Sequence, residues 1–312
     1  MRKESSLFIL LLPNALKNKF ISVKTSCKVG RRILQLTVLL TILYGSTTFA
    51  QNPVLQDSVQ QFKYNFSQFG NETWDFIKQP TKWDGTDWLK IGLITAGTFL
   101  VIETADQPAR DAVLREGKFD SNGLFIPRSQ KYYKSVPIEL GRMWGELYAP
   151  VILFSGFAIH SLLTDDITTR KIAYEIGQAS IYTGVVTLLL KTAIGRARPY
   201  MNEGKTTFHI FSSLINQDYH SLPGGHTAAA FVLSTVLSRN AKPVWLKVLA
   251  YVPATLTFVS RVYQDQHWAS DDFLGAALGY FIATWVVDQH ENNESIVEMS
   301  SIYPISIRIV LN

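Results

Sequence analysis

Six long apolar stretches dominate the chain after its first 90 residues and limit the folds it can adopt. They are rich in Ala, Leu, Gly and Val and contain proline only at Pro150 and Pro253. They cover Ile91–Val101, Ala149–Leu163, Ile172–Leu190, Thr227–Leu237, Val244–Val259 and Phe273–Val287. No alternation typical of a strand is seen before Ile302–Leu311. The sequence therefore predicts an all-α fold, a helical bundle of about six core helices.

The apolar stretches alone leave the relation to a membrane open. A bilayer span needs about 20 predominantly apolar residues, and most of these stretches are shorter. Polar residues such as Glu103, His160 and Glu175 lie within or beside them. Helices that are apolar all round can be buried in a protein core or in lipid. We expect a bundle that is either membrane-embedded or membrane-associated.

The first 50 residues have the pattern of an export signal. Arg31 and Arg32 precede the apolar run Ile33–Tyr44, and Thr48–Ala50 resembles a cleavage site. Residues 1–50 are therefore predicted to be a signal peptide or an uncleaved N-terminal anchor. Export would place the protein in the cell envelope, periplasmic or membrane-associated.

Composition divides the rest of the chain and excludes some functions. Residues 51–90 form a polar, aromatic-rich arm, residues 91–290 the helical-bundle domain and residues 291–312 a C-terminal tail. The net charge is +5, but no dense Lys/Arg cluster follows residue 33, which argues against a nucleic-acid partner. Cys27 is the only cysteine and lies in the predicted signal, so cysteine supplies no thiol nucleophile or metal site after it.

Three short polar segments stand at the edges of apolar stretches. Lys191–Pro199 carries three cationic side chains, although a single cation near a helix end usually caps it or extends towards water. Pro223–His226 reads as a turn that opens a helix, where free backbone N–H groups can bind an anion. Ser260–Asp271 contains Arg261, His267 and Asp271.

The spacing of His267 and Asp271 suggests a nucleophile. Residues four apart share a face of a helix, so the carboxylate can accept the imidazole Nδ1–H and leave Nε2 free to attack. The alternative is a helix-surface hydrogen bond of about 0.2–0.5 kcal/mol without function.

Taken together and in this order, the three segments resemble the signature of the type 2 phosphatidic acid phosphatase and vanadium haloperoxidase superfamily. In this chain the segments read Lys-x6-Arg-Pro, then Pro-x-Gly-His, then Ser-Arg-x5-His-x3-Asp, and they match every typed position of the family signature except one. The resemblance covers about residues 90–288 and implies a helical bundle with the three segments at one end. It also implies a phosphatase with no metal and no cofactor.

The resemblance implies a role for each matching residue. His267 would attack phosphorus, Asp271 would orient it, and His226 would protonate the leaving oxygen and then activate water. The phosphate would be held by Lys191, Arg198 and Arg261 and by the N–H groups of Gly224 and Gly225. Three cations can take the place of a metal because phosphoryl transfer needs mainly positioning and charge neutralisation.

Gly224 is the departure, because the family has Ser there. Loss of that hydroxyl would cost about 1.5–3 kcal/mol of phosphate binding, and Ser221 is the nearest hydroxyl in the sequence. Gly224→Ser is expected to raise phosphate affinity if the backbone suits a side chain. It should impair activity if φ is positive or the space is needed.

Other polar residues are expected to be structural. His209 and His220 should be solvated loop residues unless they line the entrance, and His160 should be a satisfied core histidine. Asp165 and Asp166 should cap a helix. Trp268 either shapes the pocket or simply packs.

Three functions remain open at this point. The leading one is a phosphohydrolase acting on a phosphorylated lipid or a small phosphoester. A vanadate-dependent haloperoxidase is the rival enzyme, because vanadate mimics the phosphate transition state. A non-catalytic envelope protein that binds anionic lipid is the third.

Overall fold

The structure is a computed structural model that describes residues 64–115, 117–119, 125–127, 136–211 and 216–302. The predicted signal or anchor at 1–50 and the strand-like run Ile302–Leu311, apart from Ile302 itself, lie outside these residues. The helices are α4 (Phe66–Lys82), α5 (Gly85–Thr104), α6 (Asp106–Arg115), α7 (Val136–Trp144), α8 (Tyr148–Thr164), α9 (Ile167–Ile194), α10 (Gly225–Asn240), α11 (Val244–Leu249), α12 (Val252–Tyr263) and α13 (Ala269–Ile302).

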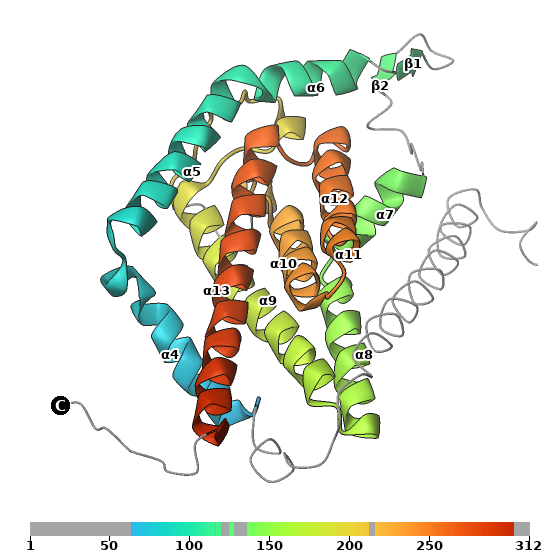
Figure 1. The fold of residues 1–312 in the computed structure, drawn as a ribbon. Helices are drawn as coiled ribbons and strands as arrows, with labels where there is room; N and C mark the ends of the chain where they lie inside the picture. Colours follow the sequence, from blue (N-terminus) through green and yellow to red (C-terminus); the bar gives the residue numbers. More distant parts are fainter. Residues whose placement is uncertain (1–63, 116, 120–124, 128–135, 212–215, 303–312) are drawn as a thin grey trace, which may run out of the picture. The chain divides into compact units, whose positions relative to one another are not determined.

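Helix α10 lies in the middle of the bundle and packs against α9, α12 and α13 (Figure 1). Its small and branched side chains, including Ala228, Val232 and Leu233, are fully buried. Helix α8 packs against α9, and α7 packs against α12. Each of the six apolar stretches lies in helical structure, which confirms the predicted all-α bundle.

Two local predictions were wrong. The stretch Val244–Val259 is two helices, α11 and α12, because Pro253 stands in the first turn of α12, where its missing N–H is tolerated. The polar segment from Asp106 to Glu146, for which the sequence predicts one or two short helices and no strand, holds the helices α6 and α7 but also a small hairpin. Its strands β1 (Gly117–Phe119) and β2 (Phe125–Pro127) pair antiparallel. Three-residue strands are too short for a pattern of alternation to reveal.

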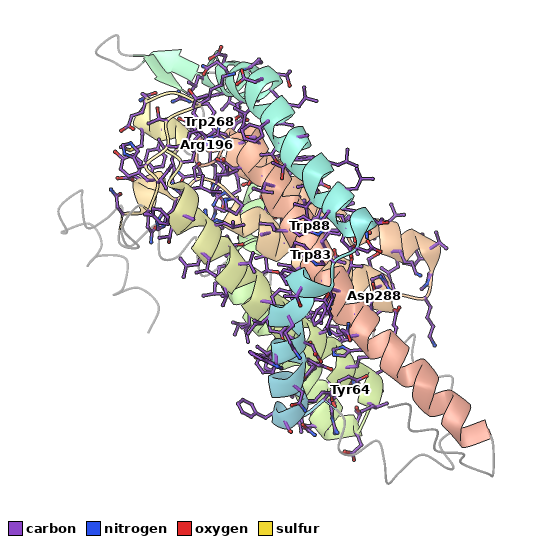
Figure 2. All side chains as sticks on the ribbon, turned by 90° about the vertical axis from the view of Figure 1, so that its left-hand side faces the viewer. Tyr64, Trp83, Trp88, Arg196, Trp268 and Asp288 are labelled. Atoms are coloured by element: carbon purple, nitrogen blue, oxygen red, sulfur yellow. The ribbon has the colours of Figure 1, made fainter. Side chains whose placement is uncertain are left out.

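The described part of the aromatic-rich arm, residues 64–90, contains α4 and the first part of α5. Pro80 lies within the last turns of α4, and α5 starts after Asp84, whose carboxylate accepts hydrogen bonds from the N–H groups of Thr86 and Asp87. Part of the arm packs onto the bundle, since the Phe76 ring stacks on Tyr182 with 4.4 Å between centroids. Trp88 instead stays 57% exposed beside Trp83 (Figure 2).

A buried ionic cluster also joins the arm to the bundle. Glu72 of α4 accepts a hydrogen bond from Gln178 of α9 at 2.8 Å. The imidazole of His290 on α13 lies between two carboxylates, with Nε2 3.3 Å from Glu72 Oε2 and Nδ1 3.1 Å from Glu175 Oε1. The cluster therefore ties α4, α9 and α13 together.

Few of the described helices are long and apolar enough to cross a membrane. Within the described part of the chain, α5 is the one helix that is long and apolar enough to cross a membrane. The pair Pro137–Trp144 and Tyr148–Thr164 would be a second candidate if its 70° bend is a break within one span.

Glycine brings α10 and α13 into close contact. A Cβ on Gly275 would lie 2.3 Å from the carbonyl oxygen of Gly224, and one on Gly279 would lie 2.2 Å from that of Ala228. Only glycine allows this approach, which places the start of α10 against the first turns of α13. The second and third polar segments of the sequence meet there.

Candidate active site

The three polar segments converge at one end of the bundle. Lys191 is in the last turn of α9, His226 in the first turn of α10, and Arg261 in the last turn of α12. Figure 2 shows Arg196 and Trp268, from the first and third segments, together at one end, while Tyr64 lies at the other. The convergence predicted from the resemblance is therefore found.

His267 lies at the centre of this site and is almost completely buried. Burial lowers the pKa of His267 well below its usual value, and the positive charges of Arg198, Lys191, His226 and Arg261 lower it further. The imidazole is therefore neutral near pH 7 and keeps a lone pair on one nitrogen. That is the state a histidine nucleophile requires.

Asp271 lies beside His267, but the two do not share a helix. His267 precedes α13, which begins at Ala269, so the prediction of a common helix face was wrong. The reason is that Asp271 helps to start the helix, since its Oδ2 accepts the N–H of Trp268 at 2.8 Å. His267 Nδ1 is 3.7 Å from Asp271 Oδ2, longer than a hydrogen bond.

Asp271 is held by partners that the sequence did not suggest. Arg196 donates from Nη1 to Asp271 Oδ1 and from Nη2 to Asp106 Oδ2, both at 2.7 Å, and all three side chains are fully buried. Asp106 also accepts the N–H of Ser270 at 2.8 Å. The hydroxyl of Ser221 donates to Asp271 Oδ2, so Ser221 supports the carboxylate and does not replace the missing hydroxyl at 224.

Trp268 packs within this network. Its ring lies 5.5 Å from the guanidinium carbons of both Arg110 and Arg196, and its indole N–H donates to the carbonyl of Ala197 at 3.0 Å. Of its two expected roles, the packing role is the one the structure displays.

The three predicted phosphate-binding cations are held by neutral oxygen atoms. Lys191 Nζ donates to the carbonyls of His220 and Ser221. Arg198 donates from Nε to the carbonyl of Gln217 at 2.9 Å and from Nη1 to that of Gln266 at 3.1 Å. Neutral acceptors orient these side chains without cancelling their charge. Burial lowers the pKa of Lys191 to about 7, and a bound anion would favour its protonated form.

Arg261 is the third of these cations and is buried. Its Nη2 contacts Gln264 Oε1, whereas its Nε is buried without a partner among the described residues. A buried guanidinium N–H with no acceptor is unfavourable unless a ligand supplies one.

His226 faces His267 across the site, with 6.4 Å between the ring centroids. Its Nε2 lies 3.6 Å from Oε2 of Glu146, a residue outside the three polar segments of the sequence. Burial lowers the pKa of His226, and the Glu146 carboxylate opposes that change. Because its side chain is 31% exposed and that of His267 only 1%, His226 lies on the more open side.

The N–H group of Gly224, predicted to donate to the phosphate, has another partner in the structure. This group donates to the carbonyl of Asp271 at 2.7 Å. Gly224 has a φ of −69°, which is allowed for any residue, but a Cβ there would lie 2.2 Å from Oδ1 of Asp272. Space, and not backbone conformation, therefore requires glycine. Gly225 begins α10, where the first N–H groups of a helix have no partner within it.

The remaining polar residues follow the structural expectation with one exception. Asp166 caps α9, and half-buried His160 lies within 3.3–3.4 Å of the hydroxyls of Thr169 and Thr164. His209 is largely exposed and pairs with Glu203 at 3.5 Å. His220 was expected to be solvated but is buried.

Comparison with known proteins places this site in a family. Residues 174–295 match the family model of the PAP2 superfamily. The chain is 38% identical over 74 residues to a lipid A 1-phosphatase from Porphyromonas gingivalis, covering 22% of this chain and 17% of that protein. It is 31% identical over 137 residues to probable lipid phosphate phosphatase 4 from Arabidopsis thaliana, covering 35% and 44%. The chain thus spans less than half the length of either relative.

Among solved structures, the chain also matches a transmembrane PAP2-type phosphatidylglycerolphosphate phosphatase from Bacillus subtilis. It aligns with a TM-score of 0.46 and 16% identity, covering 65% of this chain and 94% of that one. The segment matched by the family model contains Lys191, Arg198, His226, Arg261 and the His267–Asp271 pair. We therefore assign residues 174–295 of this chain to the PAP2 superfamily.

Proposed function

We propose that this protein is a phosphohydrolase that removes phosphate from a lipid phosphate through a phosphohistidine on His267, without a metal ion. One observation carries the proposal. A buried, neutral histidine stands among Lys191, Arg198, Arg261 and a second histidine, His226. Such a site combines a nucleophile, an anion-binding field and a proton donor.

In the first step, His267 attacks phosphorus and forms an N–P bond while the P–O bond to the leaving alcohol breaks. The leaving oxygen takes a proton from His226. Although burial lowers the pKa of His226, the negative charge of a bound phosphate favours its imidazolium form, and Glu146 acts in the same direction.

In the second step, His226 takes a proton from water, whose oxygen attacks phosphorus. The N–P bond breaks, His267 is regenerated and inorganic phosphate leaves. Asp271 stabilises the positive charge that His267 acquires while bonded to phosphorus. Its present 3.7 Å separation from Nδ1 would shorten to a hydrogen bond in that state, as catalytic hydrogen bonds often do.

The proposal that a membrane lipid is the substrate is supported by the surface of the bundle. Large apolar side chains are exposed on several helices, including Leu93 and Leu100 of α5, Leu189 of α9, and Trp245 and Val248 of α11. Apolar side chains exposed in this number are costly in water and favour contact with lipid tails. The two relatives, from Porphyromonas gingivalis and Arabidopsis thaliana, are both named as phosphatases of lipids.

The decisive experiment uses the full chain purified in detergent. Phosphate release should be measured with a polyprenyl diphosphate, phosphatidate and para-nitrophenyl phosphate, and a rapid acid-free quench should trap an alkali-stable phosphoprotein. His267→Ala should abolish both turnover and trapping. His209→Ala, at an exposed loop histidine, is the matched control and should leave both intact.

Substantial turnover by His267→Ala would contradict the mechanism. Halide-dependent peroxidation of a dye that requires added vanadate would assign the haloperoxidase function instead. Binding of anionic lipid with no turnover on any substrate would assign the non-catalytic function.

A further inference from the structure

Asp272 follows Asp271 in the first turn of α13, and the mechanism above gives it no role. The residue is fully buried. Its Oδ1 accepts a hydrogen bond from the hydroxyl of Thr227 at 2.7 Å, but its Oδ2 is buried without a partner among the described residues. A buried polar oxygen with no partner is unfavourable, so it indicates a group that is completed by something else.

The carboxyl group of Asp272 lies next to Gly224, in the Pro223–His226 turn at the start of α10. A Cβ on Gly224 would be 2.2 Å from Asp272 Oδ1, and the carbonyl of Asp271 would be 3.1 Å away. The carboxyl therefore occupies the space that a side chain at 224 would fill, one residue before the start of α10. Lys191 and Arg261, two cations that surround His267, also act electrostatically on Asp272. Asp272 thus belongs to the same cluster.

The protonation state decides what Asp272 can do there. Burial raises the pKa of Asp272 well above its usual value, and the charge of Asp271 raises it further. The hydrogen bond from Thr227 and the charges of Arg261 and Lys191 act in the opposite direction. Arg198 also interacts electrostatically with Asp272. A phosphate anion would strengthen the preference for the neutral acid, because a carboxylate would repel it.

We propose that Asp272 is a further phosphate-binding residue, whose neutral carboxyl group donates its Oδ2–H to an oxygen of the substrate phosphate. This inference rests on the proposed phosphatase function. It also explains Gly224: the donor that a hydroxyl at 224 would provide comes from the neighbouring helix, and glycine leaves room for it.

The test compares four variants with the wild-type chain: Asp272→Ala, Asp272→Asn, Gly224→Ser and the double variant Gly224→Ser with Asp272→Ala. Inhibition by inorganic vanadate measures binding of the anion, and kcat/KM measures turnover. Asp288→Asn is the control, an acid to amide change on a half-exposed residue of the same helix.

Asp272→Ala should weaken vanadate inhibition and lower kcat/KM about tenfold, the loss expected for one hydrogen bond to a charged group. Asp272→Asn keeps an N–H donor and should stay within about threefold of wild type. Gly224→Ser alone should be impaired, because the new Cβ displaces the carboxyl. The double variant should recover much of that loss, because its hydroxyl enters the space that Asp272 vacates.

Titration gives a further readout that a purely structural role would not produce. If Asp272 must be neutral, its ionisation should add a second fall in kcat/KM on the alkaline side, beyond the one caused by deprotonation of His226. Only this second fall should be absent in Asp272→Asn. The proposal is overturned if Asp272→Ala binds vanadate as well as wild type, or if the double variant is no better than Gly224→Ser alone. A wild-type chain with no phosphatase activity would instead refute the proposed function, and vanadate binding would still test Asp272.

Discussion

Arg196 and Asp271 form a fully buried ion pair, with 2.7 Å between Nη1 and Oδ1. The pair joins the loop after α9 to the first turn of α13, and Asp106 extends it to α6. It fixes the carboxylate that is proposed to orient His267. The geometry of the proposed nucleophile therefore depends on Arg196, a residue outside the motif positions.

Replacing Arg196 should damage both stability and catalysis. Arg196→Met leaves two buried carboxylates without their cation, which typically costs about 3–5 kcal/mol. We expect a large fall in the unfolding temperature and a lower kcat. Arg239→Met is the matched control, because its partners Asp288 and Glu291 are exposed and the cost should stay below about 1 kcal/mol. An equal fall in unfolding temperature and kcat in the two variants would contradict the role assigned to Arg196.

Asp271→Asn should separate binding from chemistry. The cations that hold the phosphate remain, so inhibition by vanadate should change little. The rate should fall roughly 100-fold or more, because an amide neither orients His267 nor stabilises its positive charge. Steady-state kinetics with a phosphoester checks this. A variant that loses vanadate binding but keeps its kcat would contradict the prediction.

Glu146→Gln should change the pH dependence of turnover. The Glu146 carboxylate favours the imidazolium of His226, so its removal lowers the pKa of His226 further. The protonated acid is then lost at lower pH, and the alkaline limb of the profile of kcat/KM should move to lower pH. Glu139→Gln is a suitable control, because Glu139 pairs with Arg142 and not with His226. An unchanged profile in Glu146→Gln would rule out this role.

Chelation should not affect the enzyme. Lys191, Arg198 and Arg261 already provide positive charge for the phosphate, so turnover should survive EDTA, and vanadate should inhibit competitively. Atomic absorption of the purified protein would check for a bound metal. Activity that is lost with EDTA and restored by Mg²⁺ or Zn²⁺ would contradict metal independence.

The ionic cluster of His290 should make stability depend on pH. Burial lowers the pKa of His290, but its hydrogen bonds to Glu175 and Glu72 outweigh burial and raise it to about 9. Because the pKa of His290 is higher in the folded than in the unfolded protein, protonated His290 stabilises the fold. This contribution is complete below the unfolded pKa of about 6.5 and is lost as the pH rises through about 9. The unfolding temperature in detergent should therefore fall between these values, and less so in His290→Gln. An identical slope in both proteins would remove His290 as the cause.

Much of the bundle and the positions of the proposed catalytic groups could be predicted from the sequence. The helices of the bundle could be predicted because the length and apolar character of a stretch are local properties of the sequence. The spacing from Lys191 to Arg198 and from Arg261 to Asp271 carries the family signature. Pro253 is also evident in the sequence, but the break between α11 and α12 was not predicted from it.

The supporting contacts emerged only from the tertiary structure. Asp106 lies 90 positions before Arg196 in the chain, and Glu146 lies 80 positions before His226, and nothing in their local sequence marks them. Gly224 reads as a missing hydroxyl until Asp272 is seen to fill the space beside it. Local patterns determine which segments become helices and which residues can carry chemistry. Packing of distant segments decides which buried charges are paired, which atoms lack partners and where a side chain has room.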